Sequence, residues 1–510
     1  MKHGLVIWLE YSRSSFWIPA IFTGVLLGIG FIFSIFWFLG VIGIALCVKK
    51  IQSATSYIEA LGFVAAVFTV KALCALSWSW SAYPIEWINL SGSVVQITVI
   101  FLYWFSGALW LGAGGIIFAL LARASYLTKI YPRFLWYITL SFLWILAEVA
   151  GAWFFSLMTM GPDSVLQSHL SFGFVGYLLG TTVVGIWLAK FAAVYGLTIM
   201  MVYLGIGCLF IVRVRNRAAF FRVALVSIVV VVISTLVVSR YDVYKIQASP
   251  AQIVTINTTF SPLFLSTELG QQKKSELIKK AVEAAVALAP DFILLPEDSR
   301  YLQSINPEQN PYQAMAYFQF THQGTNSILI DSGRFELPSG ETVLRATVFD
   351  GRSKSIYQSD KQYLVPQGEY VPTLYRVFMT GLGYGDRIEA IANDTSYQPG
   401  PLTSLEGAPD YLPGILFCSE SVRPDGVRAI MQQQPVLFIA HPISHGWFHT
   451  PSILWQQLDV MLQIQSRYNN VPIVSSGNMV TGKLYLPDGT IKAGKVVGTG
   501  ERFELVQFEF

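Results

Sequence analysis

The feature that most limits the fold of this chain is the stretch 14–48, which contains no charged side chain. A membrane-crossing helix needs about 20 apolar residues, so this stretch is too long for one crossing and suits a hairpin of two. We place these two spans near 14–31 and 34–48. Similar apolar stretches follow, and we expect further spans near 57–79, 92–122, 134–156, 190–212 and 222–239. The sequence therefore predicts a multi-pass α-helical membrane domain of about seven spans.

Composition divides the chain into two parts. Only 13% of its 510 residues are charged and its mean hydropathy is +0.51, whereas soluble proteins have about 25% charged residues. The deficit lies in residues 1–240, whose acids are Glu10, Glu59, Glu86, Glu148 and Asp163. Residues 245–510 have an ordinary globular composition. We therefore expect a transmembrane domain over 1–244 and a second domain over 245–510.

Basic residues alternate between the predicted loops. They occur before the first span and then in every second loop, as Lys2 and Arg13, Lys49 and Lys50, Arg123, Lys129 and Arg133, and Arg213, Arg215, Arg217 and Arg222. This pattern follows the positive-inside rule and predicts a cytoplasmic N-terminus, with everything after Arg240 on the far side of the membrane. No small-residue cleavage site follows the first apolar run, so a cleaved signal peptide is not expected. The net charge of +3 is too small to indicate nucleic-acid binding.

Two charged residues fall inside predicted spans. Lys71 and Glu148 either face a cavity or a partner, as functional residues in membranes do, or lie near helix ends and extend to the interface. The long segment 157–190 contains the aromatic residues Phe172, Phe174, Tyr177 and Trp187. This composition suits either a stretch at the level of the lipid headgroups or an ordered loop.

The second part alternates strands and helices. Strands are predicted at Gln252–Asn257, Phe292–Leu295, Asn326–Ile330, Thr342–Phe349, Gly414–Phe417, Val436–Ala440 and Pro472–Ser475, and helices at 270–289 and 452–467. Because several strands are fully apolar, they are expected to be covered on both sides, which indicates a layered α/β domain. Two long insertions, 301–320 and 373–398, are predicted to be lids or binding loops.

Cys418 ends one of the apolar runs and is followed by Glu420. The other cysteines, Cys47, Cys74 and Cys208, fall in the membrane part. A lone thiol is either a small buried apolar residue or a nucleophile. As a nucleophile it needs a base or a cation nearby, and Glu297 and Lys361 stand at or just beyond strand ends. A carboxylate, an ammonium and a thiol would suffice for acyl transfer through a thioester.

Three histidines, His441, His445 and His449, are spaced four apart, but Pro442 and Gly446 interrupt any helix that could align them. We therefore expect loop histidines and no metal site. The pair Trp447 and Phe448 is expected to pack or to face lipid.

Three motifs resemble the apolipoprotein N-acyltransferase family, a membrane-anchored branch of the nitrilase superfamily. They are Leu295-Pro296-Glu297, Lys361 followed by Leu364-Val365-Pro366-Gln367-Gly368-Glu369-Tyr370-Val371-Pro372, and Cys418-Ser419-Glu420. They occur in the family's order. In the membrane half, Trp144, Glu148, Phe172-Gly173 and Tyr195-Gly196-Leu197 are similar to family positions.

The resemblance implies a nitrilase-like αββα sandwich as the second domain. It implies a catalytic triad of Glu297 as base, Lys361 as oxyanion stabiliser and Cys418 as acylated nucleophile. Supporting or substrate-binding roles follow for the remaining site residues, which are Glu148, Glu369, Ser419, Glu420, Trp447 and Phe448.

The implied reaction moves a fatty acyl chain from phospholipid, through Cys418, to the α-amino group of a lipoprotein's N-terminal diacylglyceryl-cysteine. No cofactor is expected. The implied setting is a monomer in the bacterial cytoplasmic (inner) membrane, with its catalytic domain on the extracytoplasmic face.

The chain departs from the family pattern in four places. Ser419 stands where the family has Tyr, and Ser444-His445-Gly446-Trp447-Phe448-His449 replaces Asn-Asp-Ala-Trp-Phe-Gly. Arg467 and Tyr468 keep the family's following helix only in part, and the chain ends at Phe510 without the usual C-terminal membrane helix. Three alternatives therefore stay open: a membrane-tethered nitrilase-type amidase, an acyltransferase with another acceptor, and a non-catalytic lipid-binding homologue.

Overall fold

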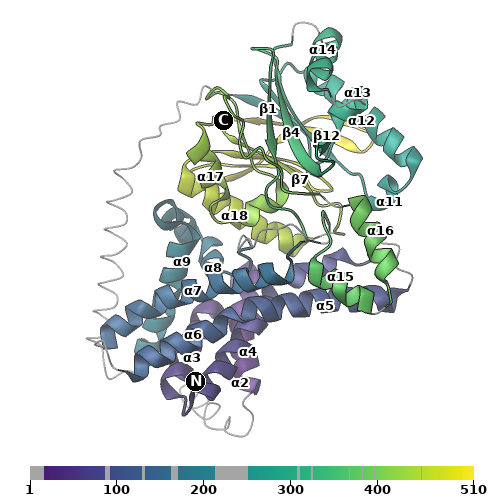
Figure 1. Ribbon diagram of the computed structural model, residues 1–510. Coiled ribbons are helices and arrows are strands. Elements are labelled where there is room, and N and C mark those ends of the chain that lie inside the picture. The colour runs from purple at the N-terminus through teal and green to yellow at the C-terminus, as the bar shows by residue number, and fades with distance from the viewer. Residues whose placement is uncertain are drawn as a thin grey trace.

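The computed structural model describes residues 17–86, 92–128, 133–161, 170–212, 251–306, 310–322, 325–366, 368–381, 383–395, 397–449 and 451–510. A helical part formed by the N-terminal residues lies against an α/β part formed by the C-terminal residues (Figure 1). A helical part and an α/β part agree with the predicted fold class, while the domain bounds 1–244 and 245–510 stay a prediction. The expected boundary at 244 lies outside the described residues.

The helical part contains α2 (Trp17–Gly28), α3 (Trp37–Ser53), α4 (Tyr57–Ala75), α5 (Ser93–Gly112), α6 (Gly114–Leu127), α7 (Arg133–Met158), α8 (Gly176–Gly180) and α9 (Val183–Val212). Within the described part of the chain, five helical stretches are long and apolar enough to cross a membrane: Ser34–Ser53, Tyr57–Ala75, Ser93–Leu127, Leu135–Met158 and Val183–Phe210. A shorter apolar helix spans Trp17–Phe31. The span expected near 222–239 lies outside the described residues, so the count of seven stays a prediction.

Helix α9 begins at Val183, so the expected start of its span at residue 190 is wrong. Its backbone leaves the helical conformation at Ala193, with φ 45° and ψ −158°, so the helix is kinked there. Three of the four aromatic residues named in the segment 157–190 favour an ordered, packed stretch over one at the lipid headgroups. Phe172, Phe174 and Tyr177 are buried and belong to the core of the helical part, while Trp187 is exposed.

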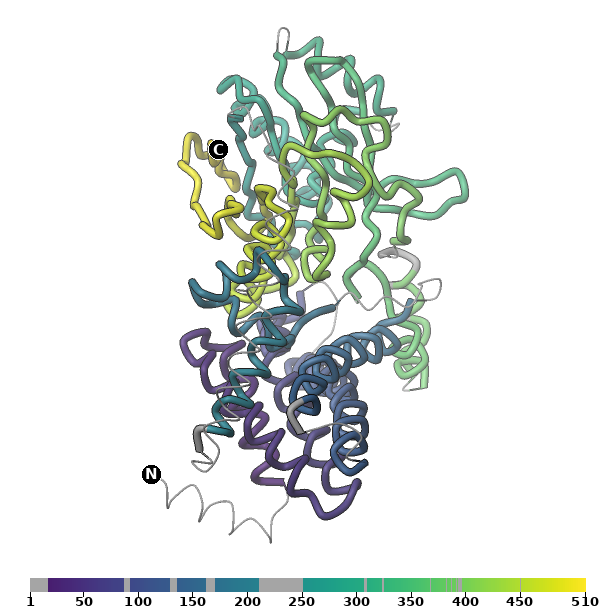
Figure 2. Tube along the Cα trace, turned by 90° about the vertical axis from the view of Figure 1, so that its left-hand side faces the viewer, coloured from purple at the N-terminus to yellow at the C-terminus, as the bar shows by residue number. Residues whose placement is uncertain are grey.

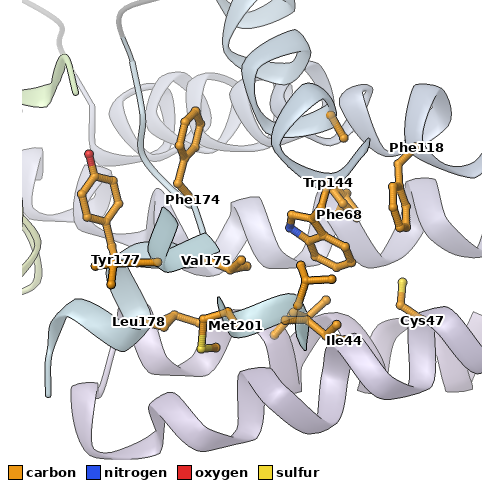
Figure 3. Close-up of a cluster of buried hydrophobic side chains, with 14 of the residues drawn as sticks. Ile44, Cys47, Phe68, Phe118, Trp144, Phe174, Val175, Tyr177, Leu178 and Met201 are labelled. Carbon is orange, nitrogen blue, oxygen red and sulfur yellow. The ribbon is translucent and has the colours of Figure 1, made fainter. Parts of the chain in front are cut away.

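Aromatic side chains fill the core between the helices (Figure 3). The Trp144 ring lies 4.9 Å from the ring of Phe68 and 5.0 Å from that of Phe118, measured between centroids. Beside them, the Nζ of Lys71 lies 2.9 Å from Oε1 of Glu148. Their side chains are 7% and 1% exposed, so these two charges pair with each other instead of extending to the interface.

The C-terminal part contains β1 (Gln252–Thr258), β2 (Phe292–Leu294), β3 (Ile328–Glu336), β4 (Thr342–Asp350), β5 (Ser355–Asp360), β6 (Gly414–Ile415), β7 (Ile439–Ser444), β8 (Ile473–Asn478), β9 (Lys483–Tyr485), β10 (Ile491–Ala493), β11 (Lys495–Gly500) and β12 (Phe503–Glu509). The seven predicted strands are present as β1–β4 and β6–β8. Strands β1, β2 and β3 are parallel neighbours, as are β6, β7 and β8. The antiparallel strands β5 and β9–β12 were not predicted.

Side-chain alternation along the strands produces four layers. In β2, Phe292 and Leu294 face the same core as Ile415 and Phe417 from the β6 segment. The opposite face of β1–β3 is covered by α12 (Glu268–Val286), α13 (Tyr301–Ile305) and α14 (Pro311–Thr321). The opposite face of β6–β8 is covered by α17 (Gly426–Gln433) and α18 (Ser452–Asn469). The predicted αββα arrangement is therefore confirmed.

The two insertions are helical, so the prediction of structureless loops is wrong. The first forms α13 and α14, and the side chain of Asn310 accepts hydrogen bonds from the N–H groups of Tyr312 and Gln313. With Pro311 as the first helical residue, this is a strong helix start that the Gly/Pro punctuation concealed. The second insertion forms α15 (Thr373–Gly381) and α16 (Gly385–Thr395).

Helices α15 and α18 lie on the side of the α/β part that faces the helical part (Figures 1 and 2). The Thr373 N–H donates to Met160 O at 2.8 Å, and Gln457 Nε2 of α18 donates to Ala75 O at 3.0 Å. These contacts connect the two parts at several points. The apolar residues Leu374, Val377 and Phe378 of α15 are half to two-thirds exposed along this junction.

Close helix packing in the membrane part depends on glycine. A Cβ on Gly114 would lie 1.9 Å from the carbonyl oxygen of Ala147, so α6 and α7 are in backbone contact here. We expect Gly114→Val to lower the free energy of unfolding by about 3 kcal/mol, because the helices must separate. Thermal unfolding in detergent measures this. Gly381→Val, where no atom lies within 4 Å of the added Cβ, is the matched control; equal stability of the two variants would contradict the close contact.

Candidate active site

Four of the residues singled out from the sequence lie just beyond strand ends. Glu297 follows β2, and Lys361 directly follows β5. Cys418 begins a 3₁₀ turn, Cys418–Val422, that follows β6, and Glu369 lies in the loop after Lys361. Clusters of functional side chains commonly form where strands end, because loops there are free of the sheet's hydrogen bonding.

The centre of the site is a buried ion cluster. The Nζ of Lys361 lies 2.8 Å from Oε1 of Glu297 and 2.7 Å from Oε1 of Glu369. The Lys361 side chain is fully buried, and both carboxylates are more than nine-tenths buried. Burial alone would lower the pKa of Lys361, but the charges of Glu297 and Glu369 outweigh it and raise this pKa above its usual range. Lys361 is therefore a permanent buried cation.

The pKa of Glu297 lies near neutrality. Burial raises it to about 7, the Lys361 ammonium opposes this rise, and the neighbouring carboxylate of Glu369 adds to it. A carboxyl group with such a pKa can accept and return a proton at physiological pH. Among the described residues, the only hydrogen-bond partner of this carboxyl group is Lys361, through Oε1, which leaves Oε2 for a proton.

Cys418 lies close enough to this ion cluster for the charges of Glu297 and Lys361 to act on its thiol. Burial raises the pKa of the thiol to about 12, the Glu297 charge adds to the rise, and the Lys361 ammonium opposes it. Cys418 as a residue is partly exposed, and its Sγ lies 3.9 Å from Ser444 O. The raised pKa keeps the thiol protonated at physiological pH.

One carboxylate connects the segments that carry Lys361 and Cys418. Glu420 accepts a hydrogen bond from Gln362 N at 2.8 Å and another from Phe417 N at 2.9 Å. These two residues are the chain neighbours of Lys361 and Cys418. Burial raises the pKa of Glu420 to about 7, opposed by the two N–H donors. Ser419 adds a second connection, because its hydroxyl donates to Tyr363 O.

Glu369 binds both a backbone N–H of its own loop and the ammonium of Lys361. Its Oε2 accepts from Val365 N at 2.7 Å, while its Oε1 contacts Lys361. The adjoining residues Val365, Pro366 and Gly368 line a cavity of about 90 Å³ together with Trp447 and Phe448. The other lining residues come from the helical part, and Phe448 packs edge-on against Trp78 at 5.6 Å. The expected packing role of this aromatic pair fits this position.

A larger apolar cavity of about 390 Å³ lies between α5 and α15. It shares the lining residues Val99 and Tyr103 of α5 with the smaller one. The two cavities therefore adjoin along α5, and the smaller one is also lined by the loop of Glu369. Such a lining suits hydrocarbon, with polar groups at one end.

The remaining expected residues lie elsewhere. Glu148 is in the helical part with Lys71 and is not part of the ion cluster. His441, His445 and His449 make separate hydrogen bonds, with Leu416 O, with the Trp455 indole and with Pro84 O. Among the residues that the structure describes, no group of three His, Cys, Asp or Glu side chains could hold a metal ion.

The sequence reasoning missed the pair that anchors Lys361. Asp360, the preceding residue, accepts two hydrogen bonds from Arg345 at 2.6 and 3.0 Å, and both side chains are buried. Arg345 stands directly opposite Asp360 on the antiparallel strands β4 and β5. Because β5 was not predicted, no pattern in the sequence connected the two residues.

No family model matches the chain. A curated relative, apolipoprotein N-acyltransferase of Rhizobium etli (strain CIAT 652), is 26% identical over 151 residues, which are 30% of this chain and 27% of the relative. Among solved structures, an amidase from Nesterenkonia sp. aligns with 14% identity and a TM-score of 0.36, covering 51% of this chain and 91% of that one.

A carbon-nitrogen hydrolase from Helicobacter pylori G27 aligns with 14% identity and a TM-score of 0.35, covering 51% of this chain and 89% of that one. The 151 residues aligned with the Rhizobium protein span about a quarter of that protein's length. Over that stretch the chain resembles an apolipoprotein N-acyltransferase, at the distance of a divergent relative.

Proposed function

We propose that this chain is a membrane-anchored acyltransferase that moves a fatty acyl chain from phospholipid, through a thioester on Cys418, to the α-amino group of a lipoprotein's N-terminal diacylglyceryl-cysteine. The observation that carries the proposal is the fully buried Lys361 held between Glu297 and Glu369, within electrostatic reach of the Cys418 thiol. The name of the curated relative supports the choice of reaction.

In the first half-reaction, the sulfur of Cys418 attacks an ester carbonyl of the phospholipid. Glu297 accepts the thiol proton as the S–C bond forms, because the thiol does not ionise beforehand. The Lys361 ammonium stabilises the developing oxyanion. When the tetrahedral intermediate collapses, the ester C–O bond breaks, and Glu297 returns the proton to the departing oxygen. The products are a thioester and a lysophospholipid.

In the second half-reaction, the amino group of the acceptor attacks the thioester carbonyl. Glu297 takes a proton from the nitrogen and delivers it to the sulfur as the C–S bond breaks. The products are an amide and the free thiol. Only side chains take part, so the proposal needs no cofactor, and one active site serves both substrates in turn.

The apolar cavities along α5 support lipid substrates. The lining of the smaller one joins the helical part to the loop of Glu369, which suits a hydrocarbon chain held beside the candidate site. Anchoring the site beside a bilayer raises the effective concentration of both lipid substrates. We place the protein in the cytoplasmic membrane of a bacterium, as a monomer, with this site on the extracytoplasmic face.

Intact-protein mass spectrometry after purification from membranes tests the thioester. We expect a fatty-acyl adduct on Cys418 in the wild type and none in Cys418→Ala or Glu297→Gln. A diacylated lipopeptide should remove the adduct and become triacylated. Removal by water alone would instead indicate an amidase-like hydrolase, and the lack of any adduct in the presence of phospholipid would refute the proposal.

The rate of thioester formation should depend on the ionisation of Glu297. Below its pKa of about 7 the carboxyl group is protonated and cannot act as a base, so the rate should rise with pH and level off above pH 7. At pH 6 we expect about one tenth of the plateau rate. Single-turnover measurements from pH 5 to 8 check this, and a flat profile would exclude Glu297 as the base.

Lys361→Met should slow the alkylation of Cys418 by iodoacetamide at pH 8 by about tenfold or more, because the ammonium that lowers the thiol pKa is lost. Intact mass measured over time gives the rate, with Cys418→Ala as the background. Lys483→Met, which breaks an ion pair with Asp459 elsewhere in the domain, should alkylate like the wild type. Equal rates for all three thiol-containing proteins would rule out this role for Lys361.

A further inference from the structure

Glu148 is the meeting point of four hydrogen bonds inside the helical part. Its Oε1 accepts from Lys71 Nζ at 2.9 Å, from the Trp144 indole at 3.2 Å and from Val175 N at 2.9 Å. Its Oε2 accepts from the hydroxyl of Thr198 at 3.5 Å. A carboxylate that is 1% exposed is thus fully engaged by α4, α7, α9 and the segment 170–177.

The segment 170–177 depends on this carboxylate. Val175 N donates to Glu148, and the next N–H, of Gly176, donates to Thr198 Oγ1 at 3.1 Å. The segment is buried, and the labelled side chains Phe174, Val175 and Tyr177 lie in the same core as Trp144 (Figure 3). Removing the carboxylate would leave the Val175 N–H and the Lys71 ammonium without a partner in an apolar core.

The same segment reaches the turn that carries Cys418. Ser171 donates twice to the carbonyl oxygen of Val422, from its N–H at 3.3 Å and from its hydroxyl at 2.5 Å. That hydroxyl also contacts the Tyr177 hydroxyl at 2.8 Å. Val422 is the last residue of the 3₁₀ turn that Cys418 begins. Two hydrogen bonds from the helical part therefore fix the far end of the nucleophile's turn.

The other supports of this turn come from the α/β part. Gln465 of α18 donates to Ser421 O at 2.7 Å, and Ser421 Oγ donates to Cys418 O at 2.6 Å. Glu420 holds the beginning of the turn through Phe417 N. The segment 170–177 thus supports the Cys418–Val422 turn from the helical part. Glu148 in turn holds this segment through the Val175 N–H.

We infer that Glu148 is a positioning residue, which holds Cys418 in register with Glu297 and Lys361 through the segment 170–177. The inference rests on the proposed function only in taking Cys418 as the nucleophile. Displacing a reacting group by about 1 Å costs up to about 100-fold in rate. A shift of Ser171 reaches Cys418 along a turn of five residues. The buried ion pair is thereby a component of catalysis that touches no substrate.

The first test removes the pair without leaving an unpaired buried charge, using the double variant Lys71→Met with Glu148→Gln. We expect thioester formation at saturating phospholipid to fall by about 10- to 100-fold while the KM for phospholipid stays unchanged. The matched control is Lys50→Met with Glu59→Gln, which removes a 2.6 Å ion pair of the same helical part. That control should keep the wild-type rate.

Ser171→Ala is the second variant, and it leaves every buried charge paired. It removes the hydroxyl bond to Val422 O, and we expect about a tenfold loss of rate with little change in thermal stability. Rates are counted per folded molecule, with the folded fraction of each variant taken from its thermal unfolding, so unfolded protein does not contribute. Wild-type rates per site in both variants would refute the inference and leave Glu148 a purely structural residue.

A readout that needs no lipid separates this inference from the proposed function. The iodoacetamide reaction at Cys418 reports the placement of the thiol beside Lys361 and Glu297, and we expect it to slow in both variants. If the wild type never carries an acyl group but alkylation slows in the variants, the proposed function fails and the inference stands. If alkylation is unchanged and the wild type is acylated, the inference fails alone.

Discussion

The site depends on one costly arrangement, an ammonium buried completely between two carboxylates. Removing an ion from water costs several kcal/mol, and the cost is recovered only when partners are held at short distance. Lys361 meets this condition with contacts of 2.8 and 2.7 Å. Neighbouring contacts hold Lys361 and its partners in place. Arg345 binds Asp360, the residue before Lys361, and Glu420 accepts from the N–H of Gln362, the residue after it. The N–H of Val365 binds the carboxylate of Glu369.

The second organising constraint is that the site faces the helical part. Helix α15, the cavity along α5 and the segment 170–177 all lie between the two parts. The apolar cavities beside the Glu369 loop suit the lipid substrates proposed above. The helices supply part of the cavity lining and, through Ser171, part of the support for the turn that carries Cys418.

Much of the fold was predictable because its determinants are local. Apolar runs such as Phe292–Leu295 and Val436–Ala440 indicated the central strands β2 and β7, and Glu297 and Cys418 followed predicted strands in the sequence. The features that the sequence did not predict depend on residues far apart in the chain, or on residue types that occur in loops as well as at helix starts. The cross-strand pair of Arg345 and Asp360 needed a register that no sequence pattern gives, and Pro311 suggested a loop where it starts a helix. That Lys71 and Glu148 form a pair with each other could be decided only by helix packing.

The connection made by Glu420 uses backbone N–H groups, which every residue except proline possesses. The contact with Glu420 therefore does not depend on the side chains at positions 362 and 417, which serve other purposes: Phe417 packs in the core, and Gln362 Nε2 donates to Gly400 O. The carboxylate thus connects the segments of Lys361 and Cys418 through main-chain groups alone, leaving both side chains to their own packing and hydrogen bonds.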